Sequence, residues 1–188
     1  TGQKHLMNLL NSFINSQWLT NSEILMSMIQ NVEQATHWMA TPQFTTIPIG
    51  DTANNIKVSK RWGGGKKTLN IGLKTFPDGG LVIENVKGKK ANSQLVFSAQ
   101  FHSRQHKHAD DLNVLYYLNN HPLLVDPGTY TYQYDLPERI YCESTRSHNT
   151  VEIDGLNSSR FRQDAFGSAL KLSTKSGPCT ILNGEVYH

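Results

Sequence analysis

Three polar clusters contain residue types that could bind a metal ion. His106, His108 and Asp110 occupy alternate positions in "HKHAD", and alternate residues of a strand face the same side. They would therefore form one row of side chains about 7 Å apart. Asp126 follows the apolar run "LLV" and precedes Pro-Gly, and His148 comes shortly before the run "TVEID".

Imidazole and carboxylate groups from separate strands are ligands that suit zinc or a similar divalent ion. Asp126 at the end of a buried strand needs a cation, a metal ion or backbone donors, because an unpaired buried carboxylate would be costly. Each cluster alone also has an ordinary explanation, as a polar strand face, a turn or a cap. Six tyrosines could stack on sugars or carry a proton: Tyr116, Tyr117, Tyr130, Tyr132, Tyr134 and Tyr141.

Two kinds of periodicity divide the chain near residue 42. Residues 4–38 have apolar residues at helical spacing, which predicts two helices joined near residue 20, with Thr20 or Asn21 as the second N-cap. Later, β-type runs such as "LNVLYYL", "PLLVDPG", "TYTYQY" and "NTVEIDG" alternate with turn residues, and "FPDGG" and "NNHP" are typical of hairpin turns. The pattern predicts a mainly β fold: an antiparallel β-sandwich preceded by a short N-terminal helical segment.

The composition narrows the possible partners. The 188 residues carry a formal net charge of +3, and basic residues gather at 58–67 and 87–90, where they could help retain an anionic polymer. No apolar stretch reaches the roughly 20 residues of a membrane span, and no recognition-helix or RNA-binding pattern indicates nucleic acid. Cys142 and Cys179 allow one disulfide at most, and the sequence leaves their pairing open.

Three motifs in a fixed order give the chain a family resemblance. "HKHADDLNVLYYL", "LLVDPGTYTY" and "STRSHNTVEIDG" resemble the heparinase II/III-like family of polysaccharide lyases, and "IPIGDT" resembles the segment that joins that family's two domains. The resemblance implies a helical (α/α) toroid followed by an antiparallel β-sandwich. Residues 1–42 would then be the terminal toroid helices with a linker, and residues 43–188 the β-sandwich domain, complete or truncated.

The resemblance also implies the reaction. It points to cleavage of acidic, uronic acid-containing polysaccharides, such as glycosaminoglycans or alginate, by β-elimination, in which a base removes the C5 proton and the 4-linked oxygen leaves. The family's principal catalytic Tyr, His and Asn lie on toroid helices, and "KHLMNLLNSFINSQW" contains no match for them. We therefore expect a longer parent chain with an N-terminal toroid domain, periplasmic or secreted, and leave open whether this part acts alone.

Site residues follow from the same resemblance. It implies a metal centre for zinc or another divalent ion, with three ligands from separate segments: His108, Asp126 and His148. His106, the first histidine of the pair, would line the catalytic groove as a catalytic residue. The other predicted site residues are one proton carrier and two substrate-binding side chains: Tyr134, Arg146 and Asn149.

Two other functions could use the same residues. His106 or His108, together with Asp110 and His148, could form the two-histidine, one-carboxylate iron site of a cupin-like non-haem iron oxygenase. A non-catalytic carbohydrate-binding module is the third interpretation. Redox activity would indicate the oxygenase, and an unsaturated, UV-absorbing product from the intact parent chain would separate a lyase from a binding module.

Overall fold

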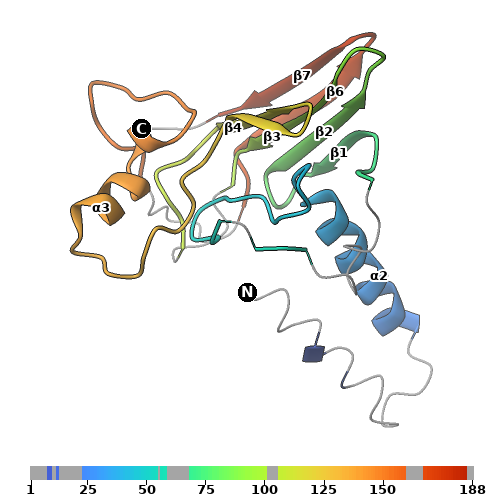
Figure 1. Cartoon of the computed structure of the whole chain (residues 1–188), viewed down its shortest axis with the longest axis horizontal. Coiled ribbons are helices and arrows are strands. Elements are labelled where there is room, and N and C mark those ends of the chain that lie inside the picture. The colour runs from blue at the N-terminus through green and yellow to red at the C-terminus, as the bar shows by residue number, and fades with distance from the viewer. Residues whose placement is uncertain are drawn as a thin grey trace.

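A five-stranded antiparallel sheet forms the centre of the protein in this computed structural model (Figure 1), which describes residues 8–9, 12, 23–54, 56–58, 68–100, 106–159 and 167–185. Its strands lie side by side in chain order: β1 Gly72–Phe76, β2 Leu81–Lys87, β3 Asn92–Ser98, β4 Asn113–Leu118 and β5 His121–Leu124. A second antiparallel sheet consists of β6 Leu170–Ser176 and β7 Cys179–Gly184. These sheets confirm the prediction of a mainly β, antiparallel sandwich.

Both predicted hairpin turns are confirmed. Asn119 and Asn120 join β4 to β5 with φ angles of 47° and 66°, the conformation that a two-residue type I′ turn requires and that Asn tolerates. Gly80 ends the turn between β1 and β2 at a φ of 62°. A Cβ at this position would collide with the carbonyl oxygen of Ala99, so the turn requires glycine.

The central sheet has an apolar layer on each face. Leu81 and Val82 are neighbours in β2 and therefore point to opposite faces. The first face packs against the end of helix α2 (Glu23–Trp38) and the segment after it, through Trp38 and Ile47 (Figure 1). The second face packs against the β6–β7 hairpin through Ala169 and its neighbours. Because each fully buried large apolar side chain contributes about 1.5–3 kcal/mol, both layers stabilise the sheet.

Part of the helical prediction lies outside the described residues. α2 confirms a helix from Glu23 to Trp38, and residues 8, 9 and 12 are also helical. The predicted junction near residue 20, with Thr20 or Asn21 as the N-cap, falls in a stretch that is not described. The division of the chain into residues 1–42 and 43–188 stays a prediction.

Two predicted strands are wrong. "TYTYQY" at 129–134 follows an irregular path, and "NTVEIDG" at 149–155 forms only an isolated bridge between Ile153 and Leu156. A strand needs a paired neighbour, but the N–H of Thr129 donates to Thr52, outside any ladder. Between the two segments lie a helix and a 3₁₀ turn that the sequence analysis missed: α3 Pro137–Glu143 and η2 Thr145–Ser147.

The remaining general predictions concern the membrane, the cysteines and the basic clusters. Among the described helices, none is long and apolar enough to cross a membrane. Cys142 and Cys179 are both free thiols. The lysines at 87–90 are exposed, whereas the cluster at 58–67 lies outside the described residues apart from Val58.

Candidate metal centre

The three predicted metal ligands meet at one end of the central sheet. β4 and β5 form a hairpin, so Asn113, the first residue of β4, lies beside the chain that leaves β5. His108 precedes β4, and Asp126 follows β5. His148 follows η2 and is held beside β4, because the carbonyl of Asn149 accepts a backbone hydrogen bond from that strand at 3.1 Å. The hairpin thereby joins residues that are far apart in the sequence.

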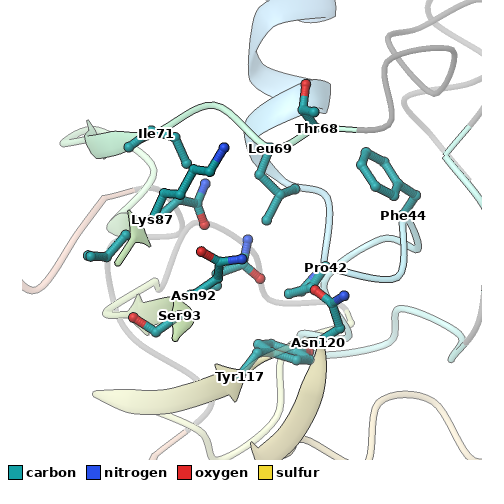
Figure 2. Close-up of a pocket in the computed structure, with 13 residues that line it drawn as sticks. Pro42, Phe44, Thr68, Leu69, Ile71, Lys87, Asn92, Ser93, Tyr117 and Asn120 are labelled. Atoms are coloured by element: carbon teal, nitrogen blue, oxygen red, sulfur yellow. The ribbon is translucent and has the colours of Figure 1, made fainter. Parts of the chain in front are cut away.

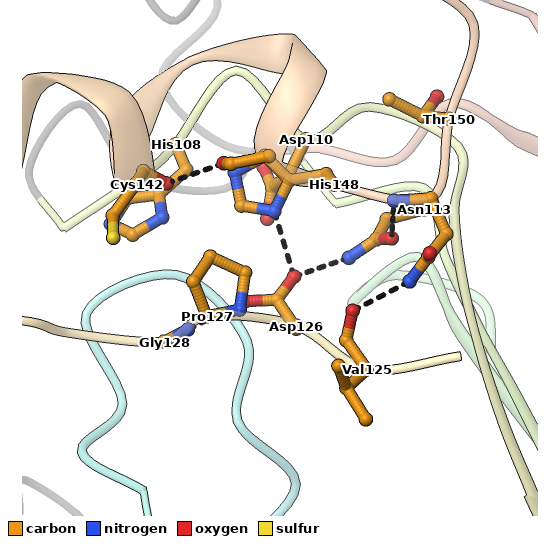
Figure 3. A network of polar contacts seen from close by, with 12 residues as sticks. His108, Asp110, Asn113, Val125, Asp126, Pro127, Gly128, Cys142, His148 and Thr150 are labelled. Carbon is orange, nitrogen blue, oxygen red and sulfur yellow. Dashed lines mark hydrogen bonds and ion pairs between the residues drawn. The ribbon is translucent and has the colours of Figure 1, made fainter. Parts of the chain in front are cut away.

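Asp126 is the centre of a buried hydrogen-bond network (Figure 3). Its Oδ2 accepts hydrogen bonds from His148 Nδ1 at 2.8 Å and from Asn113 Nδ2 at 2.5 Å, and its Oδ1 accepts one from the N–H of Gly128 at 2.9 Å. The four residues of β5 are exposed, so the predicted buried strand is wrong. β5 is an edge strand, and Asp126 is buried because the chain turns inward after it towards Asn113 and His148.

His108 is fully buried and contacts a residue from the segment before the sheet. Its Nε2 donates to Oδ1 of Asp51 at 2.9 Å. Arg139 of α3 donates to the same oxygen at 2.5 Å, and His106 Nδ1 donates to the other oxygen at 2.9 Å. Burial disfavours the charged form of Asp51, but the hydrogen bonds from both histidines and Arg139, with the charge of Arg139, outweigh it and lower its pKa. Asp51 is therefore an ionised acceptor for all three groups.

His108 and His148, the two buried histidines of this site, each keep one free ring nitrogen. A carboxylate only accepts hydrogen bonds, so the ring nitrogen that contacts it carries the hydrogen, and the other nitrogen of a neutral ring has a lone pair. These other nitrogens, His108 Nδ1 and His148 Nε2, are buried without a hydrogen-bond partner. The two ring centres lie 5.4 Å apart. The lone pairs of these two nitrogens are therefore available to a ligand.

The residues present fit a divalent ion. A carboxylate offers about four acceptor positions, and Asp126 uses three of them for His148, Asn113 and Gly128. One ligand atom each from His108, Asp126 and His148 lies within 4.8 Å of those of the other two residues. Two imidazoles and one carboxylate suit zinc, whereas calcium prefers oxygen ligands alone.

A second group of residues, Asp51, His108 and Glu143, meets the same distance criterion. Both of its carboxylates lie 2.5 Å from the same guanidinium nitrogen of Arg139. A cation bound there would have to share these carboxylates with a positive charge. The group of His108, Asp126 and His148 is therefore the better metal centre.

The predicted row of His106, His108 and Asp110 is wrong. Residues 106–112 do not form a strand, because His106 and Leu112 adopt φ angles of 62° and 59° that break the alternation of side chains. Asp110 is buried and forms an ion pair with Lys107. An iron site that uses Asp110, as in the oxygenase alternative, is therefore not assembled.

His106 lies at the exposed side of the site. Its side chain is 61% exposed, although its Nδ1 is bound to Asp51. Its ring packs edge-on against Tyr132 at 6.3 Å, and Tyr132 packs against Tyr134 at 6.4 Å. The guanidinium of Arg139 lies 5.3 Å from the ring centre of Tyr134. A non-glycine residue at a φ of 62° is uncommon, and such residues cluster at functional sites.

Arg146 and Asn149, the predicted substrate-binding residues, both form contacts within the protein. Arg146 donates two hydrogen bonds to Glu152, at 2.7 and 3.1 Å. The side-chain amide of Asn149 donates to the carbonyl of Val125 at 2.7 Å. Their role in substrate binding, and that of Tyr134 in proton transfer, stay predictions. Four of the six tyrosines are exposed and thus accessible to a sugar: Tyr130, Tyr132, Tyr134 and Tyr141.

Three residues of the site were missed by the sequence analysis: Asp51, Asn113 and Arg139. A signal for Arg139 exists in "LPERIYCE", because proline favours the first position of a helix and Glu138 suits its first turn. Asp51 follows Gly50 in "IPIGDT", where Gly-Asp indicates a turn but not its partner. No local signal distinguishes Asn113 from any other residue at the start of a strand.

A separate pocket of about 510 Å³ (Figure 2) lies at the end of the central sheet that is far from the candidate metal centre. It is next to the turns that join β2 to β3 and β4 to β5, and Lys87 and Asn120 contribute to its wall. Tyr117 also lines it, and burial, together with the charge of Asp126, raises the pKa of this tyrosine to about 12. The pocket is not part of the metal centre, which lies where Asn113 pairs with Ser98 at the other end of β4.

Comparisons with known proteins agree with this fold. Residues 68–179 match the family described as "Heparinase II/III-like, C-terminal". A heparinase III gene product of known structure has a TM-score of 0.73 and 17% identity, over 96% of this chain and 32% of its own. A mutant of the heparan sulfate lyase HepC from Pedobacter heparinus has a TM-score of 0.74 and 14% identity, and the match covers 96% of this chain and 32% of the lyase. No curated protein sequence matches the chain.

Proposed function

The chain belongs to the heparinase II/III-like C-terminal family, and on this premise we propose that it is the metal-bearing β-sandwich part of a polysaccharide lyase. Its substrates would be acidic, uronate-containing glycans, cleaved by β-elimination. The names of two similar structures, a heparinase III and a heparan sulfate lyase, favour a glycosaminoglycan of the heparan sulfate class over alginate. Because this chain spans 32% of the length of each, the activity is proposed for a longer parent chain that also contains a toroid domain.

One observation carries the metal assignment. His108 Nδ1 and His148 Nε2 are buried ring nitrogens without a partner, and they belong to residues that converge with Asp126. A buried polar atom without a partner costs about 1–3 kcal/mol, so two such atoms in one cluster support a ligand at this site. Zinc bound by these residues would supply a fixed positive charge beside His106 and stabilise the sandwich.

His106 and Tyr134 are the proposed catalytic residues of this chain. In the elimination, the C5–H bond breaks, its electron pair forms the C4–C5 double bond, and the C4–O bond breaks with protonation of the leaving oxygen. His106 has an exposed imidazole that can hold or polarise the uronate. Tyr134 has an exposed phenol in the same aromatic group and can carry a proton. Arg146 and Asn149 remain proposed substrate-binding residues.

Elemental analysis of chelator-free protein tests the metal assignment. The chain should contain about one equivalent of zinc, because in the described part of the chain one group of residues has the necessary ligand set and no competing cation. His148→Ala should lose the metal, since it removes one of the two free ring nitrogens. His106→Ala is the matched control: its imidazole lies on the other oxygen of Asp51 and should not be required. A metal-free wild-type protein, or loss of zinc in His106→Ala, would contradict the assignment.

Product formation by the intact parent chain tests the reaction. The parent chain should release an unsaturated, UV-absorbing product from heparan sulfate, and His106→Ala or Tyr134→Phe should lower the rate by about 10²–10⁴-fold while zinc is retained. Binding of the glycan without any such product would instead support the carbohydrate-binding module.

A further inference from the structure

We propose that Asp51 is a positioning residue that sets the tautomers of His106 and His108. It would thereby leave a lone pair of His108 in the candidate metal centre and a lone pair of His106 on the exposed side of the site. The inference rests on the proposed function for the roles of the two histidines. The residue comes from the segment between α2 and the central sheet, which the sequence analysis took only as a connection.

The hydrogen bonds of Asp51 select opposite nitrogens of the two rings. Oδ1 accepts from His108 Nε2, and Oδ2 accepts from His106 Nδ1, each at 2.9 Å. In neutral rings, the hydrogen then lies on Nε2 of His108 and on Nδ1 of His106. The free lone pairs are on His108 Nδ1, which is buried in the metal centre, and on His106 Nε2. The Asp51 carboxylate therefore leaves the lone pair on Nδ1 in His108 and on Nε2 in His106.

Arg139 holds this carboxylate in one orientation. Its side chain is buried, and it donates to Oδ1 of Asp51 at 2.5 Å while also contacting Glu143 at 2.5 Å. A guanidinium can only donate hydrogen bonds. The atom of residue 51 that faces Arg139 must therefore be an acceptor, whatever side chain is placed there.

The backbone of residues 50–52 is also docked against both loops of the site. The N–H of Asp51 donates to the carbonyl of His106 at 3.1 Å, and the carbonyl of Thr52 accepts from Thr129 at 3.1 Å. Gly50 lies so close that a Cβ would be 2.5 Å from the carbonyl oxygen of His106. Asp51 thus cannot move away from the histidines without breaking the contacts of its own backbone.

The Asp51→Asn variant gives a specific prediction. Because Arg139 requires an acceptor, the amide oxygen should face Arg139 and His108, and the NH₂ group should face His106. His106 would then have to accept at Nδ1 and carry its hydrogen on Nε2. His108 should keep its tautomer. A change from Asp to Asn beside a histidine is known to reverse an imidazole tautomer in the serine protease triad while the geometry stays intact.

Nitrogen-15 NMR of the histidine rings tests the proposal, in chelator-treated protein and over a pH range in which the spectra themselves show neutral rings. In the wild-type chain, His106 should be the Nδ1–H tautomer and His108 the Nε2–H tautomer. In Asp51→Asn, only His106 should change. Asp78→Asn, an exposed residue in the turn between β1 and β2, is the matched control and should change neither ring.

Zinc binding provides the second measurement. Asp51→Asn should still bind one equivalent, with affinity lowered by about 10–100-fold as for other residues that support a metal ligand. The proposal is overturned if His106 in the wild-type chain is Nε2–H, if its tautomer is unchanged in Asp51→Asn, or if this variant loses zinc as completely as His148→Ala. The last result would make Asp51 a ligand. A wild-type chain that binds no zinc would refute the proposed function, and the tautomers in the metal-free protein would still decide the role of Asp51.

Discussion

At the residue scale, hydrogen bonds from buried polar side chains hold the Asp126 carboxylate in place. Asp126 is held by three donors, one of which is the Asn113 amide, and the oxygen of the same amide accepts the N–H of Asn149 at 3.0 Å. Asn113 therefore orients the carboxylate and joins the chain after η2 to β4. The bond to Asp126 is buried and the bond from Asn149 is partly buried, so an unpaired group at either place would be costly.

We expect Asn113→Ala to destabilise the protein by about 1–3 kcal/mol, because it removes one of the three donors to Asp126 and leaves the Asn149 N–H without its acceptor. Zinc affinity should also fall by about 10-fold or more. Urea unfolding and a zinc titration measure the two effects. Asn183→Ala, at an exposed position of β7, is the control, with an expected change within about 0.5 kcal/mol. Equal stability of the two variants would contradict the role of Asn113.

At the scale of elements, the segment before the central sheet acts as a part of the site. It contacts the loop of His106 through Gly50 and Asp51, and the loop after Asp126 through Thr52 and Asn54, whose side chain donates to Pro127 at 2.7 Å. Two glycines permit this close approach, since a Cβ on Gly128 would lie 2.5 Å from the carbonyl oxygen of Thr52. The connection between helix and sheet therefore also supports the two loops that contain His106, His108 and Asp126.

Gly50→Ala should destabilise the protein more than Gly177→Ala. Both glycines have left-handed φ angles, 53° and 58°, so alanine costs about 1–2 kcal/mol of backbone strain at either position. Only at residue 50 would the new Cβ collide with the backbone, whereas at residue 177 nothing lies within 4 Å. Thermal unfolding of both variants isolates the effect of the contact. If both variants lose the same stability, the segment around Gly50 can move away from the His106 loop at no cost in free energy.

At the scale of the whole molecule, polar contacts join the two sheets beyond their apolar layer. Glu84 of β2 accepts hydrogen bonds from Lys175 of β6 at 2.6 Å and from Thr180 of β7 at 2.7 Å. Burial opposes the charge of Glu84, but these two partners outweigh it and lower its pKa below the ordinary value of 4.5. The exposed lysines at 87–90 lie at the far end of the central sheet from the candidate metal centre. A polymer bound at that centre would reach these lysines only if it extended along the molecule.

Acid should weaken the contact between the sheets. A lowered pKa stabilises the folded protein above the unfolded pKa of about 4.5, and this contribution is lost as the pH falls below that value towards the folded pKa. Glu84→Gln should therefore be less stable than wild type by about 1 kcal/mol at pH 7, and the difference should shrink below pH 4.5. Urea unfolding across this range measures it. Glu185→Gln, in an exposed pair, is the control, and a pH-independent difference for Glu84→Gln would contradict the prediction.

The sequence by itself determined the main features of this protein. Period-two runs and turn residues predict the antiparallel sheets, because strands and tight turns depend on local side-chain patterns. "FPDGG" and "NNHP" predict the hairpin turns for the same reason. His108, Asp126 and His148 could be named as ligands because their motifs, in a fixed order, resemble those of the heparinase II/III-like family.

Only the tertiary structure decided which atoms of these residues are free and what holds them. Alternation predicted a row that included Asp110, but a left-handed residue at His106 broke the row and an ion pair with Lys107 removed Asp110. Asp51 and Arg139 lie 88 residues apart in the sequence and meet on one carboxylate oxygen. No local pattern encodes such a contact, because its energy depends on burial and on partners that folding alone brings together.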